Sequence, residues 1–336
     1  MGKGFSRHQV SKNRIPGIVI RLTLILTVSA LFFVSIAALS ASTANDLMSL
    51  QKKELANIPS NILPSYSATN FKSFDNQTNL SGWFFQTDDP ISTVILVHDI
   101  GSNRMQFDVD TVDLIEDMLK SGYNVFLFDQ RNSGESEGVI SGYGYLEWQD
   151  VVGAIEHVRK ISVTTDVILY GVGAGCSAVL IALDKLPAPG EFDEIKDAPF
   201  KSLKFDRSYV IGTILDSPAK DSDDYIQPEV RKSGGLSFLT QYTVPYAIRI
   251  SAGESNSFNL SAIISRLQIP VCILYGDMDT YIGASRIAQI VDERKRLNPS
   301  TTVAGVFPNA EYLMSYSADP VAYRQEILDF LAVHFQ

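Results

Sequence analysis

Val167-Ile-Leu-Tyr-Gly-Val-Gly-Ala-Gly-Cys-Ser-Ala-Val-Leu180 is the stretch that decides the fold of this 336-residue chain. Its first four residues are large and apolar, which is typical of a strand buried on both faces. Three glycines, Gly171, Gly173 and Gly175, then permit a tight turn, and the small residues that follow predict a helix over 174–183. A buried strand that turns directly into a helix is the repeating unit of a parallel sheet covered by helices.

Apolar strands and amphipathic helices alternate on both sides of this segment. Continuous apolar runs predict strands at 94–97, 125–128, 210–215, 271–275 and 302–307, and helical periodicity predicts helices at 112–119, 145–159 and 321–335. Alternating polar and apolar residues over 67–86 predict an antiparallel hairpin around Asp75-Asn-Gln-Thr-Asn79. The chain is therefore expected to form an α/β fold, with a mostly parallel central sheet and helices on both faces.

One long insertion interrupts this alternation. The region 219–266 separates two predicted strands and contains Gly234-Gly235, several short apolar runs and an aromatic group around Phe238, Tyr242 and Tyr246. Ligand sites of parallel sheets lie beyond the carboxyl ends of the strands. A long insertion above these ends is most simply a lid.

The N-terminal part predicts a membrane segment. Residues 22–44 carry no charge and are long enough to cross a bilayer at about 20 residues per span. Basic residues precede or edge this run, and the first acidic residue is Asp46. We therefore predict a cytoplasmic segment over 1–21, a signal-anchor over 22–44, a connector over 45–66 and an extracytoplasmic domain over 67–336. The alternative is a signal peptide cleaved after Ser42-Thr-Ala44, which would release a secreted protein.

Composition argues against several functions. The formal net charge of −10 speaks against nucleic-acid binding, which requires clustered cations.

Cys176 and Cys272 lie in apolar surroundings, so buried free thiols are expected, and a disulfide between them stays open. Neither cysteine has a partner at metal-ligand spacing, so no metal or cofactor is predicted. The glycines at 171, 173 and 175 lack the spacing of a dinucleotide fingerprint and fall in the third predicted strand–helix unit instead of the first. The glycine pattern is therefore weak support for nucleotide binding, and a nucleotide-binding module stays a third, separate hypothesis.

Two further segments make the chain resemble the α/β-hydrolase superfamily: His98-Asp-Ile-Gly-Ser-Asn-Arg104 and Phe126-Leu-Phe-Asp-Gln-Arg-Asn-Ser-Gly-Glu-Ser-Glu-Gly138. The chain is most similar to serine-aminopeptidase-like and prolyl-oligopeptidase-like bacterial hydrolases that carry an N-terminal membrane anchor. The resemblance covers about residues 67–336. It implies an α/β-hydrolase fold in which Ile100 and Ala174 line the oxyanion-hole region and the second segment is a structural turn.

The resemblance places the catalytic triad of the family on Gly173, Asp279 and Tyr312. The nucleophile elbow of such hydrolases reads G-x-S-x-G, but this chain has glycine at the central position. Asp279, in Gly276-Asp-Met-Asp279, takes the acid position, and Phe307-Pro-Asn-Ala-Glu-Tyr312 puts tyrosine in the histidine position. Glycine cannot attack a substrate, and tyrosine, with a pKa of about 10, is a poor base near neutrality. Glycine also relieves the backbone strain of an elbow.

These substitutions imply a hydrolase fold that has lost its activity and that binds a hydrophobic or peptide-like ligand or another protein. The alternative is an active ester or amide hydrolase that uses other groups. Cys176 and Ser177 are the nearest candidate nucleophiles, three and four residues beyond the elbow.

Four side chains near the predicted site carry further expectations. Asp99 replaces the glycine that usually follows the histidine, and its carboxylate would repel an oxyanion unless it points away. Asp279 is expected to be a turn carboxylate, with a cation or amine ligand as the alternative. Tyr312 either hydrogen-bonds Asp279 and plugs the old site or faces solvent. His98 is expected to bond nearby backbone rather than act as a base.

Overall fold

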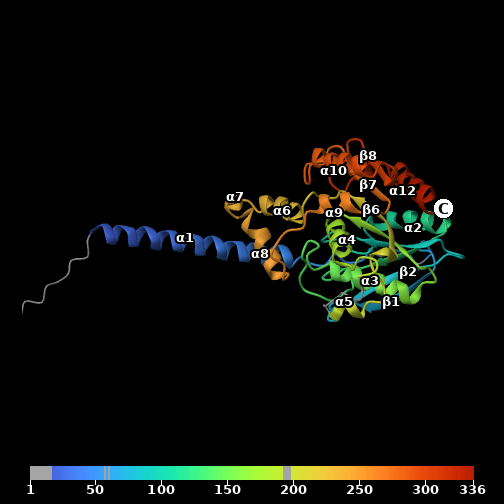
Figure 1. Ribbon diagram of the computed structural model, residues 1–336, viewed down its shortest axis with the longest axis horizontal. Helices are drawn as coiled ribbons and strands as arrows, with labels where there is room; N and C mark the ends of the chain where they lie inside the picture. The colour runs from blue at the N-terminus through green and yellow to red at the C-terminus, as the bar shows by residue number, and fades with distance from the viewer. Residues whose placement is uncertain (1–16, 57, 60, 192–197) are drawn as a thin grey trace, which may run out of the picture.

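The computed structural model describes residues 17–56, 58–59, 61–191 and 198–336. Within these residues, one eight-stranded sheet forms the centre of the globular body, in the order β1-β2-β4-β3-β5-β6-β7-β8 (Figure 1). β2 is antiparallel to β1 and β4, and every other pair is parallel. The strands are β1 (Tyr66–Lys72), β2 (Asn79–Phe85), β3 (Ser92–Val97), β4 (Tyr123–Phe128), β5 (Val167–Val172), β6 (Val210–Asp216), β7 (Val271–Gly276) and β8 (Thr302–Phe307).

Helices cover both faces of this sheet because the central strands are apolar on both sides. Ile95 and Val97 of β3 face one core, while Val94 and Leu96 face the other. The first core includes residues of α3 (Trp148–Ile161), α4 (Ala174–Lys185) and α10 (Ala284–Leu297), and the second includes residues of α2 (Thr111–Lys120) and α12 (Pro320–Phe335). The shorter helices of the body are α5 (Ala198–Ser202), α11 (Ser315–Ala318) and the 3₁₀ turns η1 (Asp108–Asp110), η3 (Arg207–Tyr209) and η5 (Pro299–Thr301).

The expected α/β architecture is confirmed. Every predicted strand and helix of the body is present, with ends shifted by a few residues, and the hairpin is formed by β1 and β2. In the hairpin turn, Asp75 Oδ1 accepts hydrogen bonds from the amides of Gln77 (2.8 Å) and Thr78 (3.1 Å). Such a side-chain-to-backbone bond is the usual reason why aspartate favours turns.

Short helices connect β6 to β7, in the region where the sequence predicts a lid. They are η4 (Ser222–Tyr225), α6 (Gln227–Lys232), α7 (Ser237–Thr240), α8 (Thr243–Ser251) and α9 (Leu260–Arg266), and we call residues 219–266 the lid. They follow the carboxyl end of β6. The lid therefore begins at the carboxyl ends of the parallel strands, where the ligand sites of such folds lie. In Figure 1, α6, α7 and α8 lie on the side of the body from which the N-terminal helix leaves it.

The N-terminal helix α1 (Gly17–Met48) projects from the body (Figure 1). Its most apolar 18-residue window has a mean hydropathy of 2.5 and is wholly unburied, so α1 is long and apolar enough to cross a membrane. The helix extends beyond the predicted span 22–44 at both ends. Its C-terminal turns contact the body, where Ala44 and Met48 are buried and the hydroxyls of Ser40 and Thr243 lie 2.6 Å apart. The predicted cytoplasmic residues 1–16 lie outside the described part of the chain.

Candidate active site

The turn between β5 and α4 has the geometry of an elbow with Gly173 at its tip. Gly173 has φ +55° and ψ −126°, a conformation that side chains disfavour. Its amide donates to Asp216 O and its carbonyl accepts from the Cys176 amide, both at 2.9 Å. A Cβ built on Gly175 would lie 2.7 Å from His98 O, and closer still to Val97 O. The turn therefore needs these glycines to pass so near the end of β3.

Polar atoms already fill the space beside Gly173. A Cβ built on Gly173 would lie 2.6 Å from both Asp99 Cγ and the Tyr312 hydroxyl oxygen, and closer still to Asp99 Oδ1. Favourable contacts between carbon atoms require about 3.5–4.0 Å. The space into which a side chain at the predicted nucleophile position would project is therefore occupied by two other residues of the same chain.

Asp99 points toward the predicted oxyanion hole and not away from it. Its Oδ1 accepts a hydrogen bond of 2.7 Å from the Ala174 amide, and the Ile100 amide also favours its ionised form. Burial nevertheless dominates and raises the pKa of Asp99 to about 7. In hydrolases, amides at these positions stabilise the negative charge of the transition state. Here, the carboxylate of Asp99 engages them first.

Tyr312 completes the occupation of this space. Its hydroxyl lies 3.4 Å from Asp99 Oδ1, and its ring stacks on Tyr281 with a centroid distance of 4.2 Å. Among the described residues, no hydrogen bond joins Tyr312 to Asp279, so the expected partner is replaced by Asp99. Burial raises the pKa of Tyr312 well above its usual value of 10, which keeps the phenol neutral. A neutral phenol can donate a hydrogen bond but cannot serve as a base near pH 7.

Asp279 lies on the loop after β7, with only 3% of its surface exposed. Its Oδ1 accepts from the amides of Tyr281 (2.8 Å), Ile282 (2.9 Å) and Gly283 (3.3 Å), as expected for a turn carboxylate. Its Oδ2 has no hydrogen-bond partner. In a serine hydrolase, the acid orients a histidine, and the position predicted for that histidine holds Tyr312. Burial raises the pKa of Asp279.

Solved structures of known proteins have the same arrangement of elements. An esterase of Pyrococcus furiosus matches with a TM-score of 0.63 at 18% sequence identity, over 85% of this chain and 100% of that chain. The esterase RhEst1 of a Rhodococcus species matches with a TM-score of 0.54 at 16% identity, over 80% and 99%. The chain has the α/β-hydrolase fold. At these identities, the likeness establishes the fold alone.

Sequence relatives of this α/β-hydrolase-fold chain are proteins without an assigned activity. The uncharacterized protein YqkD of Bacillus subtilis is 21% identical over 255 residues, which cover 75% of each chain. The uncharacterized protein YfhR of Escherichia coli is 27% identical over 264 residues, which cover 76% of each chain. YfhR of Salmonella typhimurium is 34% identical over 113 residues, 32% of this chain and 37% of that protein. No protein-family model matches the chain.

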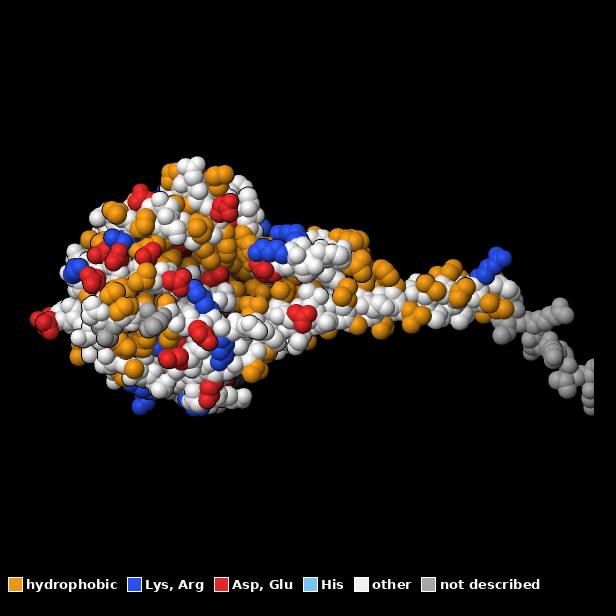
Figure 2. All heavy atoms as spheres, turned by 180° about the vertical axis from the view of Figure 1, so that it is seen from behind, with side chains coloured by type: hydrophobic (Ala, Val, Ile, Leu, Met, Phe, Trp, Pro, Cys, Tyr) orange, Lys and Arg blue, Asp and Glu red, His pale blue; other side chains and the backbone are white. Residues whose placement is uncertain are grey.

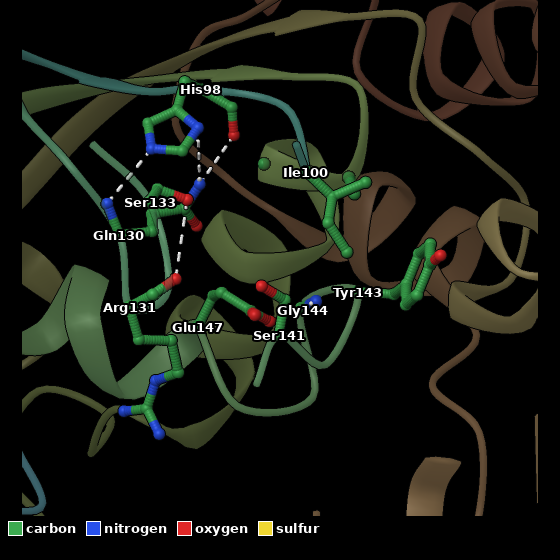
Figure 3. A pocket seen from close by; sticks show the side chains of 11 residues that line it. His98, Ile100, Gln130, Arg131, Ser133, Ser141, Tyr143, Gly144 and Glu147 are labelled. Carbon is green, nitrogen blue, oxygen red and sulfur yellow. Dashed lines mark hydrogen bonds between the residues drawn. The ribbon is translucent and has the colours of Figure 1, made fainter. Parts of the chain in front are cut away.

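His98 has the structural role expected from the sequence. The backbone amide of Gln130 donates to Nε2 of His98 at 3.0 Å. The ring proton is therefore on Nδ1, which donates to the backbone oxygen of Asp99 at 2.7 Å. Burial lowers the pKa of His98 and keeps the ring neutral. Figure 3 shows His98 and Gln130 beside a cavity that Tyr143 and Ile100 also line. Its volume of about 10 Å³ suits one water molecule, not a substrate.

A buried ion pair holds the two loops that carry the family resemblance. Arg104 and Asp129 are both buried, and Nη2 of Arg104 lies 2.6 Å from Oδ2 of Asp129. Asp129 also accepts from the backbone amides of Arg104 (2.7 Å) and Glu135 (2.8 Å). These bonds tie the loop after β3 to the loop after β4, as expected for a structural turn. Asp99 is held in the same loop as Arg104, so this ion pair helps to set its position.

The candidate nucleophiles next to the elbow are inaccessible. Cys176 and Ser177 are completely buried in α4, and Cys176 Sγ donates to the carbonyls of Gly171 and Asp216 at 3.2 Å. Burial raises the pKa of Cys176, which keeps it a thiol. Cys176 and Cys272 are both free and buried, so the expectation of buried thiols is confirmed. Within the described residues, no group of His, Cys, Asp and Glu side chains could hold a metal ion.

Two residues of this region were missed by the sequence analysis. Tyr281 stacks on Tyr312 and donates its hydroxyl to Tyr225 O at 2.8 Å. The Nζ atom of Lys232, in the lid, lies over the ring of Tyr281 at 4.8 Å from the ring centre. The aromatic residue two positions after Asp279 was a usable signal, because the loop after β7 carries the acid position. No sequence pattern indicated Lys232.

Proposed function

We propose that this chain is a membrane-anchored, extracytoplasmic protein of the α/β-hydrolase fold that has lost hydrolytic activity and acts by binding. The observation that carries the proposal is the filled space at the elbow. Asp99 and Tyr312 stand where a nucleophile would project from Gly173. Losing the nucleophile alone costs about six orders of magnitude in well-studied serine hydrolases.

The remaining parts of the site argue the same way. An oxyanion hole without a triad can still accelerate hydrolysis by about 10³-fold over water. The Ala174 amide is not free for that role, because Asp99 Oδ1 accepts its hydrogen at 2.7 Å. A second negative charge at this position would be repelled by the carboxylate. Neither the nucleophilic step nor the electrostatic step of acyl transfer is therefore supported.

A binding role is assigned to the surface around the lid instead. Lys232 of α6 reaches over Tyr281, and Tyr281 stacks on Tyr312, so the lid is in contact with the closed site. A hydrophobic or peptide-like ligand, or another protein, would be recognised from this side. The membrane orientation follows from the basic residues that precede the apolar helix α1, which would place the body outside the cytoplasm.

The direct test rebuilds the catalytic groups one by one in the full chain in detergent. We expect no ester turnover from Gly173→Ser/Tyr312→His, since Asp99 still blocks the serine and its oxyanion amide. Adding Asp99→Gly should make turnover measurable, and Asp279→Ala in that triple variant should abolish it. Ester turnover by the unaltered protein that disappears in Asp279→Ala would refute the proposal. It would favour the alternative of an active hydrolase with non-standard groups.

A further inference from the structure

The segment from Arg231 to Ala252 differs in charge from the rest of the chain. It contains two arginines and one lysine and no acidic residue, whereas the whole chain has a net charge of −10. Arg231 and Lys232 are exposed at the end of α6. Lys232 pairs with Glu229 at 2.7 Å, and Arg249 pairs with Asp223. Within the described residues, Arg231 is the cation of this segment that has no ion pair, and an exposed cation of this kind can bind a negatively charged partner.

The same segment exposes large apolar side chains at regular spacing. Phe238 of α7, Tyr242 of the turn after it, and Tyr246 and Ile250 of α8 lie at intervals of four residues, and the last two therefore share one face of α8. With Leu236, they make up what we call the lid face, and each is between 52% and 70% exposed. The opposite side of α8 is buried in the body through Val244 and Ile248. A helix that is apolar on both sides requires a second apolar environment.

The lid face lies directly beside the helix that is apolar enough to cross a membrane. α8 packs against α1, and the Ser40 and Thr243 hydroxyls mark this contact. A groove of about 500 Å³ runs between the two helices, lined by Phe33 and Ile36 of α1 and by Tyr246 and Ile250 of α8. Figure 2 shows hydrophobic side chains continuing from the lid onto α1, with basic side chains beside them.

The length of α1 sets the depth of this contact in a bilayer. From Arg21, which can reach the headgroups, the helix rises about 30 Å to Ala41, which equals the thickness of the hydrocarbon core. Ile36 and Phe33 then lie about 8 and 12 Å further in along the helix axis. The groove that they share with Tyr246 and Ile250 is therefore at the outer edge of the hydrocarbon. Amphipathic helices at membrane surfaces insert to about this depth, 5–10 Å.

We infer that the lid face lies in the outer interface of the bilayer that α1 crosses, with Arg231 on anionic phospholipid headgroups. The inference rests on the membrane anchor of the proposed function. Tyrosines are enriched at membrane interfaces, where the ring is buried and the hydroxyl stays wet, and this explains Tyr242 and Tyr246. An acyl chain of the outer leaflet would occupy the groove between α1 and α8. The lid thereby connects the bilayer to the closed site through Lys232 and Tyr281.

The test measures the depth of labelled positions in the full chain reconstituted into vesicles of phosphatidylcholine and phosphatidylglycerol. Single cysteines at Phe238→Cys, Leu26→Cys and Val163→Cys carry an environment-sensitive dye, and lipids with a spin-labelled acyl chain act as quenchers. Val163 is the matched control, because it is 76% exposed and precedes β5. It therefore lies at the amino ends of the parallel strands, whereas the lid begins at their carboxyl ends. The native cysteines are completely buried, so the unaltered protein is the blank.

We expect lipid to quench the Phe238 label clearly, though less than the Leu26 label, because an interfacial segment inserts only about 5–10 Å. The Val163 label should show almost none. Omitting phosphatidylglycerol should reduce the quenching at Phe238 and leave Leu26 unchanged.

Three other outcomes overturn the inference, each for a different reason. A Phe238 label that behaves like Val163 while Leu26 is quenched places the lid in water and leaves the anchor intact. A Phe238 label shielded from both lipid and aqueous quenchers indicates a second copy or another protein on the lid face. An unquenched Leu26 label removes the anchor itself, and with it that part of the proposed function.

Discussion

Gly173→Ala adds a single methyl group where Asp99 and Tyr312 already fill the space. That methyl would lie 2.6 Å from Asp99 Cγ and from the Tyr312 hydroxyl oxygen. Such overpacking typically costs about 1–3 kcal/mol. The backbone at φ +55° adds a further ~1–3 kcal/mol for any residue with a side chain. We therefore expect Gly173→Ala to lower the free energy of unfolding by about 2–6 kcal/mol, measured by urea unfolding in detergent.

A double-mutant cycle separates the two contributions. Asp99→Gly removes the nearest atoms, so Gly173→Ala should cost about 1–2 kcal/mol less in that background. Asp99→Asn is the matched control, because it keeps the volume and should leave the cost of Gly173→Ala unchanged. Equal costs in the unaltered and Asp99→Gly backgrounds would refute the reasoning. So would a Gly173→Ala variant within about 0.5 kcal/mol of the unaltered protein, as for an ordinary surface change.

Three further predictions follow from buried groups. Burial raises the pKa of Asp99 from 3.8 to about 7, so the folded state binds more protons than the unfolded state between these values, and stability should fall as pH rises from 4 to 7. Asp99→Asn should weaken this fall in pH-dependent urea unfolding; an unchanged profile would contradict it. Arg104→Met should lower the free energy of unfolding by about 3–5 kcal/mol, because it leaves Asp129 buried without its partner; a cost below about 1 kcal/mol would count against the assigned role. Cys176 and Cys272 should react with a thiol reagent only after unfolding, and rapid labelling of the native chain would show that they are accessible.

Much of the fold was readable because buried parallel strands leave an unambiguous pattern. β3, β4, β5 and β7 are buried along their whole length and each contains an apolar run of four residues or more, from which it was predicted. The helix α10 was not predicted, because it is rich in charge and buries only a narrow stripe. One member of that stripe is Arg294, whose guanidinium donates to backbone carbonyls of Ile264 and Ile269 at 2.7 Å. A buried arginine hides an amphipathic pattern from any reading based on hydrophobicity.

The site was predicted by position and not by contact. The resemblance to α/β-hydrolases pointed to Gly173 and Tyr312, and the structure brings these two residues together at the elbow. Asp99 was recognised as an unusual replacement for glycine, but the sequence could not show that it fills the space left by the missing nucleophile. That requires knowing how β3 and β5 place their loops side by side. The exchange is physically consistent, since a large residue at 99 needs a small residue at 173.

The most direct measurement of the central claim is the rate of ester and aminopeptide hydrolysis by the unaltered full chain, run beside Asp279→Ala and Asp99→Asn. We expect all three proteins to be indistinguishable from the uncatalysed reaction and none to be labelled by a fluorophosphonate probe. Turnover by the unaltered chain that either substitution abolishes would refute the loss of hydrolytic activity. It would show that the carboxylates at this elbow still perform chemistry.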